Sequence, residues 1–306
     1  MDKTSVDWAG SFPALVTPFA ADGAIDEGAY RRNVDLCIGY GSGGLVANGC
    51  TGEPWSQTLD ERKRIVEICV DAAAGRVPVI AGTGGIRTDD VIELSLHAEE
   101  AGCDGVMVWA PFFVMPPLED LIAHFEEVAD AIALPMLLYN IPKYNNNALT
   151  PALVSRLADI DNVVGIKESS GDFNNFYETL TLAGDRIFIF LGPIYRYGPA
   201  AFMHGARGYV NTLGNLWGRE CAEMHHAVLA GDMERAKEIQ VRGRALNNLI
   251  CGNGRNLYAG LKAAMNIVGL PGGYPRKPLR ALGEPHLAEL RAGLETLNLT
   301  ASAAAE

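Results

Sequence analysis

Short apolar runs alternate with longer amphipathic segments along most of the chain. Runs of this length, bounded by Gly, Pro and Asn, are typical of buried strands, and the longer segments have helical periodicity. Eight runs qualify as strands: 12–16, 44–47, 77–81, 105–109, 135–139, 163–167, 187–191 and 208–210. Eight βα units within roughly 220 residues predict an α/β fold of the (β/α)8 TIM barrel type in preference to a doubly wound sheet.

Helix boundary signals support this division. Thr58 and Glu61 form a capping-box pattern before a helix at 62–74, and Thr88 and Thr150 open two more. After residue 215 no strand pattern remains, and four helices are expected at 218–230, 232–251, 255–268 and 285–297. We therefore expect a catalytic barrel at 1–217, followed by a barrel-closing helix and C-terminal helical region at 218–306, with a frayed tail at 301–306.

Composition narrows the functional classes. The 306 residues are 48% hydrophobic and 20% charged, and a net charge of −12 without any basic run argues against nucleic acid as a partner. Six widely spaced cysteines without a C-x-x-C pair indicate reduced thiols, not a disulfide framework or zinc ribbon. No signal-peptide core or long apolar stretch is present, so we expect a cytoplasmic protein without a membrane partner.

Lys167 ends the sixth predicted strand, where burying a charged amine is energetically unfavourable. Burial disfavours the ammonium form, so a lysine there can be neutral and nucleophilic near pH 7, as Schiff-base formation with a carbonyl substrate requires. Alternatively, the side chain snorkels to solvent or pairs with Glu168.

Two other strand ends carry polar groups. Strand two runs into the turn 48–53, where Gly49 exposes backbone N–H groups beside the Cys50 thiol and the Thr51 hydroxyl, an arrangement suited to a carboxylate or simply to a tight turn. Strand five ends at Tyr139, whose phenol could relay protons or pack as an amphipathic core residue. An amine, carboxylate donors and a proton-moving hydroxyl together are what imine chemistry on a 2-oxo acid needs.

These motifs resemble the signatures of the dihydrodipicolinate synthase and N-acetylneuraminate lyase superfamily of class I, Schiff-base-forming lyases, over essentially the whole chain. The first is the turn 49–53 with Glu61 eight residues after Glu53, and the second is Tyr139 with Lys167 following 28 residues later. The resemblance implies that Lys167 forms the imine, that Tyr139 is the general acid/base and that Thr51 binds the substrate carboxylate. It also implies a barrel with C-terminal helices, a homotetramer, and no metal or organic cofactor.

Three positions depart from this pattern. Cys50 stands where the superfamily usually has a hydroxyl, and Phe113 stands where the synthases have a tyrosine that completes the proton relay across a subunit contact. Tyr144 replaces the arginine that holds the aldehyde's carboxylate in those synthases. Tyr144 and the amides of 145–147 would suit a hydroxylated or neutral polar acceptor arm, unless 145–147 is only a turn.

The remaining candidates are weaker. Asn211 and Val210, at the end of strand eight, are expected near the substrate, as is the loop 82–85, whose partial glycine pattern is too weak for a dinucleotide site. A metal site at 221–226 is not expected, because adjacent helical histidines point about 100° apart.

The sequence therefore predicts a Schiff-base lyase for a 2-oxo acid, acting by aldol cleavage or condensation with pyruvate and an aldehyde, or by dehydration or deamination of a 2-keto-3-deoxy-type acid. Two alternatives remain: the lysine-pathway synthase that condenses pyruvate with aspartate semialdehyde, and a non-catalytic, regulatory barrel that binds a sugar acid.

Overall fold

A closed ring of eight parallel strands forms the centre of the computed structural model, which describes residue 1 and residues 3–299. The tail expected at 301–306 lies outside the described residues. The strands run in the order β1-β8-β7-β6-β5-β4-β3-β2, and the Leu15 N–H donates to the Val46 carbonyl at 3.0 Å to close the ring. The (β/α)8 prediction is confirmed. The strands are β1 (Gly10–Pro13), β2 (Leu45–Ala47), β3 (Val79–Gly82), β4 (Gly105–Trp109), β5 (Met136–Asn140), β6 (Val163–Glu168), β7 (Phe188–Leu191) and β8 (Gly208–Asn211).

The first strand lies earlier than the predicted 12–16, and its ladder with β8 ends at Pro13. The apolar run continues buried, and the N–H groups of Ala14 and Leu15 still donate to backbone carbonyls, but a side chain satisfies two other backbone groups of the run. Asn215 accepts from the Val16 N–H at 3.0 Å and donates to the Ala14 carbonyl at 2.8 Å. An apolar pattern indicates that a segment is buried, but it does not indicate which groups form hydrogen bonds with its backbone. The predicted bounds of the first strand were therefore wrong.

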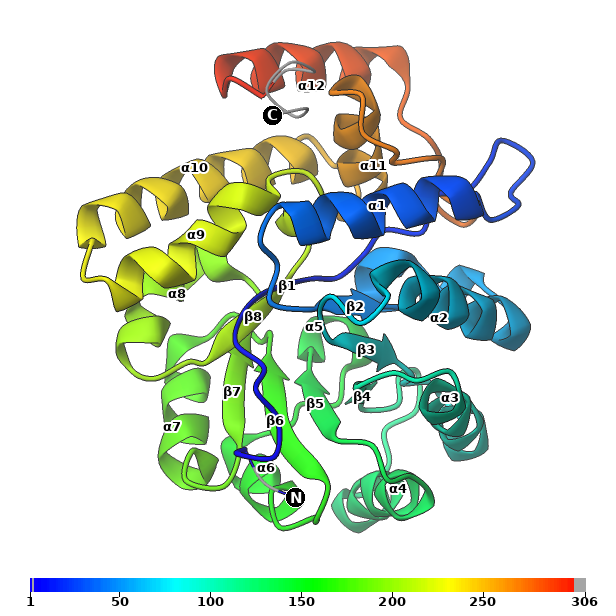
Figure 1. Ribbon diagram of the computed structural model, residues 1–306, viewed down its shortest axis with the longest axis vertical. Coiled ribbons are helices and arrows are strands. Elements are labelled where there is room, and N and C mark those ends of the chain that lie inside the picture. The colour runs from blue at the N-terminus through cyan, green and yellow to red at the C-terminus, as the bar shows by residue number, and fades with distance from the viewer. Residues whose placement is uncertain (2, 300–306) are drawn as a thin grey trace.

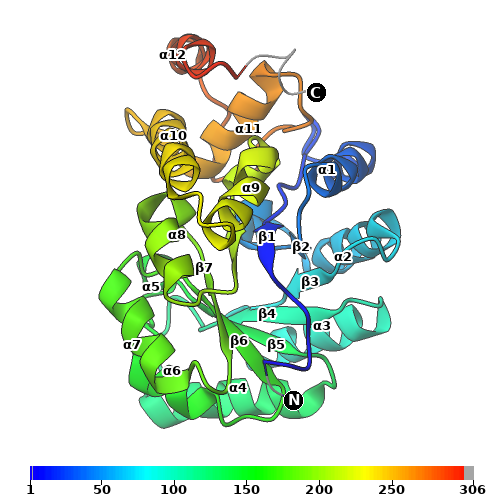
Figure 2. The ribbon, with the colours of Figure 1, turned by 60° about the vertical axis from the view of Figure 1, so that its left-hand side comes forward.

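Helices enclose the barrel, and Figure 2 shows the strands between α1–α3 on one side and α6–α8 on the other. Thr58 caps α2 in the expected capping box with Glu61, and Thr150 caps α6, whereas Arg87 is the N-cap of α3. The surrounding helices are α1 (Glu27–Gly39), α2 (Leu59–Ala73), α3 (Thr88–Glu100), α4 (Leu118–Ala131), α6 (Pro151–Leu157), α7 (Phe173–Ala183), α8 (Ile194–Met203) and α9 (Gly218–Leu229).

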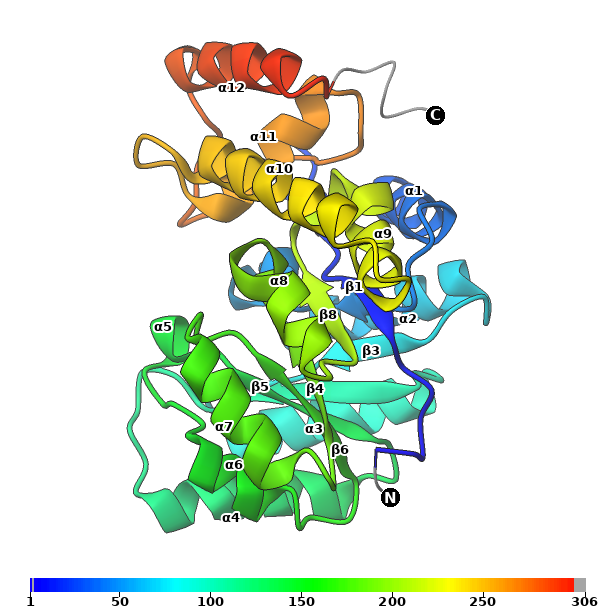
Figure 3. The same ribbon diagram turned by 90° about the vertical axis from the view of Figure 1, so that its left-hand side faces the viewer.

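Three more helices extend the barrel on one side, as Figures 1 and 3 show. They are α10 (Met233–Cys251), α11 (Leu257–Ile267) and α12 (Glu284–Thr296). Shorter elements lie in the loops: α5 (Pro142–Asn145) after β5, and the 3-10 turns η1 (Cys50–Gly52), η2 (Pro54–Ser56) and η3 (Leu213–Asn215).

The barrel interior is filled by side chains, so it is a core and not a channel. Trp8, Phe12, Phe188 and Phe190 pack in this interior cluster, which also includes Tyr139 near the carboxyl end of β5. Gly165 of β6 leaves room for this packing, since a Cβ there would lie 2.4 Å from the Phe188 ring. Because these rings fill the interior, a ligand can lie on the barrel axis only outside the part that they occupy.

A buried ion pair joins the C-terminal helices to the turn that follows β2. Lys262 of α11 pairs with Glu53, and their side chains are 1% and 0% exposed. Lys262 also donates to the Tyr274 carbonyl at 2.9 Å, and the Arg276 N–H donates to Glu53 at 3.1 Å. Glu53 has a φ of 59°, an uncommon conformation for a residue with a Cβ, so these contacts hold the turn in a shape that it would not favour alone.

Removing one member of this pair should be costly. We expect Lys262→Met to lower the free energy of unfolding by about 3 kcal/mol or more, because Glu53 is left charged and buried. Adding Glu53→Gln should recover part of that loss. The matched control is Lys63→Met, whose partner Glu93 lies at the surface, 2.6 Å away, and which should cost less than about 1 kcal/mol.

Chemical denaturation measures these differences. The buried ion pair would be contradicted if Lys262→Met lowered the free energy of unfolding no more than the surface control does. It would also be contradicted if the loss in the double variant equalled the sum of the losses in the two single variants.

Candidate active site

Lys167 lies on β6 beside Tyr139 of β5, and the two residues are paired in the strand register. The lysine is 5% exposed, and its Nζ is 3.8 Å from the centroid of the Tyr139 ring. Among the described residues, none accepts a hydrogen bond from Nζ or forms an ion pair with it. Burial lowers the pKa of Lys167 to about 8, and the only opposing influence is the nearby Cys50. A substantial fraction of the amine is therefore neutral in mildly alkaline solution.

The alternative pairing with Glu168 is wrong. Glu168 is fully buried and is held by the side-chain amides of Asn140 at 2.8 Å and Asn175 at 2.7 Å and by the Ser170 N–H at 2.6 Å. Consecutive strand residues point to opposite faces, so the carboxylate turns away from the barrel axis. Snorkelling is also excluded by the burial of Lys167.

The Tyr139 phenol lies among groups that can exchange protons with it. It is 3% exposed, and Cys50 and Ser169 are close enough to influence its pKa, which burial raises well above 10. Burial likewise raises the pKa of the Cys50 thiol. Both groups therefore remain protonated at neutral pH, as a general acid beside a neutral amine should be.

Sequence reasoning missed Ser169. Its buried hydroxyl lies near the Tyr139 phenol and lowers the pKa that burial raises there. Gly192 makes room for it, because a Cβ there would lie 1.9 Å from the Ser169 oxygen. The available signal was the period of two along a strand, which puts residue 169 on the same face as Lys167.

The turn after β2 lies beside these groups. Gly49 is extended and precedes η1, in which Thr51 is 3% exposed and its hydroxyl lies 3.1 Å from that of Thr212. A 3-10 turn leaves its first N–H groups without partners inside the turn, so the amides of Cys50 and Thr51 are suited to carboxylate oxygens.

A cavity of about 640 Å³ opens beside Cys50 and extends outward past Tyr144, which is half-exposed. The polar acceptor arm expected from the neighbouring amides is not supported. Asn145 donates to the Ala110 carbonyl at 3.3 Å, and Asn147 donates to the carbonyls of Pro111 and Val114, both at 2.7 Å. These amides fix the chain that follows β4, as a structural turn would.

Of the expected site residues, Cys50 and Tyr144 line this cavity, whereas Lys167, Tyr139 and Thr51 lie behind Cys50 and are not part of its lining. Phe113 is 94% exposed with a φ of 73°, and its neighbour Phe112 lines the cavity in its place. Val210 is buried in the barrel interior. Asn211 donates to the Ser11 hydroxyl at 3.1 Å and accepts from the Gly214 N–H, so its amide fastens β8 to β1 and does not face a ligand.

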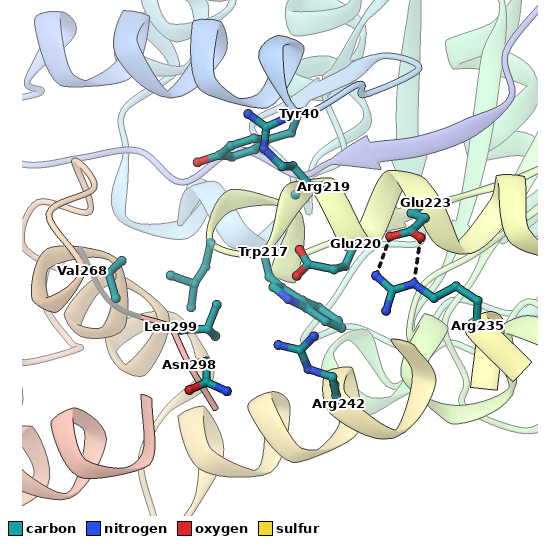
Figure 4. Close-up of a pocket in the computed structure, with 12 residues that line it drawn as sticks. Tyr40, Trp217, Arg219, Glu220, Glu223, Arg235, Arg242, Val268, Asn298 and Leu299 are labelled. Atoms are coloured by element: carbon teal, nitrogen blue, oxygen red, sulfur yellow. Dashed lines mark hydrogen bonds and ion pairs between the residues drawn. The ribbon is translucent and has the colours of Figure 1, made fainter. Parts of the chain in front are cut away.

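A second hollow of about 290 Å³ lies between α1, α9 and α10 (Figure 4). Its arginines are engaged within the chain: Arg235 binds Glu223 at 2.7 Å, and Arg242 lies over the Trp217 ring at 5.7 Å. It holds no nucleophile. Within residues 1 and 3–299, no three metal-ligating side chains cluster, and no helix is long and apolar enough to cross a membrane.

Comparisons with known proteins agree with this geometry. The model of the dihydrodipicolinate synthetase family matches residues 7–297. A 4-hydroxy-tetrahydrodipicolinate synthase from Agrobacterium fabrum is 40% identical over 79% of this chain and 82% of its own length. Another, from Pelobacter propionicus, is 37% identical over 95% of this chain and 99% of its own length.

Solved structures are similar throughout. YagE, a prophage protein of Escherichia coli K12 belonging to the dihydrodipicolinic acid synthase family, was crystallised with pyruvate. It is 30% identical and superposes with a TM-score of 0.92 over 96% of this chain and all of its own. A dihydrodipicolinate synthase from Aquifex aeolicus is also 30% identical, with a TM-score of 0.89 over 95% of this chain and 99% of its own.

Proposed function

The chain belongs to the dihydrodipicolinate synthetase family and is a Schiff-base-type lyase for a 2-oxo acid, and we propose that Lys167 is the amine that forms the imine. The observation that supports this assignment is the environment of Nζ, which is buried, unpaired with any described carboxylate and 3.8 Å from the Tyr139 ring. Desolvation keeps part of the amine neutral, and only the neutral amine is a nucleophile.

The reaction begins when Lys167 attacks C2 of pyruvate or a related 2-oxo acid. Tyr139 donates a proton as the carbinolamine loses water, and the resulting iminium withdraws electrons from C3. The enamine then forms by loss of a C3 proton or by C3–C4 cleavage. Thr51 and the amides of the turn hold the C1 carboxylate and orient C2 toward the amine. The iminium is the electron sink, so the proposal includes no metal or organic cofactor.

The relatives favour a second candidate, because they are named 4-hydroxy-tetrahydrodipicolinate synthases. Tyr144 argues against it. By resemblance, this position carries the arginine that binds the aldehyde's carboxylate, and a phenol cannot replace a bidentate guanidinium. We therefore favour an aldolase, or a dehydratase or deaminase, over condensation with aspartate semialdehyde.

Assembly and location complete the proposal. A run of exposed apolar side chains follows β4, comprising Phe113, Val114, Met115 and Leu118, of which the first is 94% exposed. Such a patch is typical of a subunit interface and supports the homotetramer. The six free cysteines support a cytoplasmic location.

Borohydride reduction in the presence of pyruvate tests the imine directly. We expect a reduced pyruvate adduct on Lys167, located by mass spectrometry of peptides, and no adduct in Lys167→Arg. Lys262 serves as an internal control, because its pKa is also lowered to about 8 but Glu53 occupies its amine. Absence of any Lys167 adduct with a range of 2-oxo acids would contradict the proposal.

Proton transfer by Tyr139 can be measured separately. We expect Tyr139→Phe to slow exchange of the pyruvate C3 hydrogens with deuterated solvent at least about 100-fold, because the general acid is lost. Tyr209→Phe is the matched control, since Tyr209 is also buried and its hydroxyl has no partner among the described residues. Proton NMR follows the exchange, and a Tyr139→Phe rate equal to that of the control would show that another group moves the proton.

A further inference from the structure

The cavity beside the candidate catalytic lysine has a wall built from aromatic rings of separate elements. Trp55 comes from η2, Tyr144 from α5 and Tyr258 from α11. The ring centroids of Trp55 and Tyr258 are 5.0 Å apart, and those of Tyr144 and Tyr258 are 6.5 Å apart. Tyr258 is 6% exposed between two half-exposed rings, of which Trp55 is 42% and Tyr144 50% exposed. Flat apolar faces are therefore available at the cavity mouth.

The charged side chains of the cavity wall are already engaged within the chain. Arg87 pairs with Asp90 at 3.1 Å. Arg62 donates to the carbonyls of Gly82 at 2.9 Å and Gly84 at 3.1 Å, it lies over the Trp109 ring at 5.9 Å, and its partnerless Nε is buried. Arg87 is 68% exposed, so its pair with Asp90 is a weak surface pair, but in the buried part of the cavity a carboxylate would lack the free, bidentate cation that it needs after desolvation.

The wall also offers few groups for sugar hydroxyls. The amide of Asn145 is used by the Ala110 carbonyl and the Asn147 N–H. The side-chain oxygen of Asn256 caps α11 by accepting from the Tyr258 N–H at 2.9 Å. Burial raises the pKa of the Tyr258 phenol well above 10, and the nearby Tyr144 adds to this shift. The Asn256 side-chain NH2 and the tyrosine hydroxyls are the main groups left for a polyol arm, and any of its hydroxyls without a partner would be unfavourable in a desolvated site.

We propose that the substrate's arm beyond C3 is a flat, uncharged aromatic group that packs against the wall formed by Trp55, Tyr144 and Tyr258. Aromatic rings pack well against one another in offset or edge-to-face arrangements, and such packing needs no charged partner. This inference rests on the proposed imine at Lys167 and specifies the second substrate for it.

In the synthetic direction, C3 of the pyruvate enamine attacks the carbonyl carbon of an aromatic aldehyde. The C3–C4 bond forms, the carbonyl π electrons move to the aldehyde oxygen, and that oxygen takes a proton. Water then hydrolyses the iminium, releasing a 4-aryl-4-hydroxy-2-oxo acid and the free Lys167 amine. Cleavage is the reverse of these steps.

Aldehyde competition tests the proposal. With saturating pyruvate, we expect kcat/KM for benzaldehyde to exceed those for glyceraldehyde and succinate semialdehyde by at least about tenfold, measured as pyruvate consumption. Tyr258→Leu keeps an apolar side chain but removes the flat ring, and should raise KM for benzaldehyde about tenfold, with pyruvate trapping at Lys167 measured in parallel to show that the variant is folded. The control is Tyr177→Leu, a half-exposed tyrosine on α7 that does not line the cavity.

The outcomes separate the two proposals. If pyruvate is trapped on Lys167 but glyceraldehyde or succinate semialdehyde is the better acceptor, or Tyr258→Leu behaves like the control, the aromatic-arm inference is wrong and the imine stands. If no 2-oxo acid is trapped, the proposed function is wrong and the inference falls with it.

Discussion

Desolvation of one amine is the constraint on which the rest of the site depends. The chain contains 37 acidic residues, yet none of those described pairs with Lys167, and the adjacent Glu168 is turned away and held by three donors. An ion pair would restore the ammonium form and remove the nucleophile. The aromatic core fills the barrel interior, and Lys167 is buried next to Cys50, which lines the neighbouring cavity.

The C-terminal helices contribute to this site from a distance. Through Lys262, α11 fixes Glu53 and thereby the turn that carries Cys50 and Thr51. Through Tyr258, the same helix forms part of the cavity wall. One helix of the extension thus supports both the turn proposed to bind the carboxylate and the cavity proposed for the rest of the substrate.

The positions that could be predicted from the sequence are those that follow from strand ends, whereas the roles of these residues stay a prediction. Apolar runs located all eight strands, and parallel strands put Lys167 and Tyr139 side by side. Tyr258 and Lys262 were missed because both lie on α11. The periodicity of a helix indicates which of its residues are buried, but not which other elements those residues contact. The roles of Asn145 and Asn147 also depended on tertiary contacts, since a free amide and one bonded to a distant carbonyl look identical in a sequence. The hydrogen bonds between the Asn215 side chain and the backbone of Ala14 and Val16 are likewise tertiary contacts that the sequence does not reveal.

The pKa of Lys167 tests the central claim most directly. Lysines can be labelled with nitrogen-15 and titrated by NMR in the ligand-free protein, and the Lys167 signal can be identified by its absence in Lys167→Arg. Because burial favours the neutral amine, we expect the signal to titrate near pH 8, and the rate of imine formation with pyruvate to rise through the same pH and then level off. A titration near 10.5, the ordinary value for a lysine, would contradict the account.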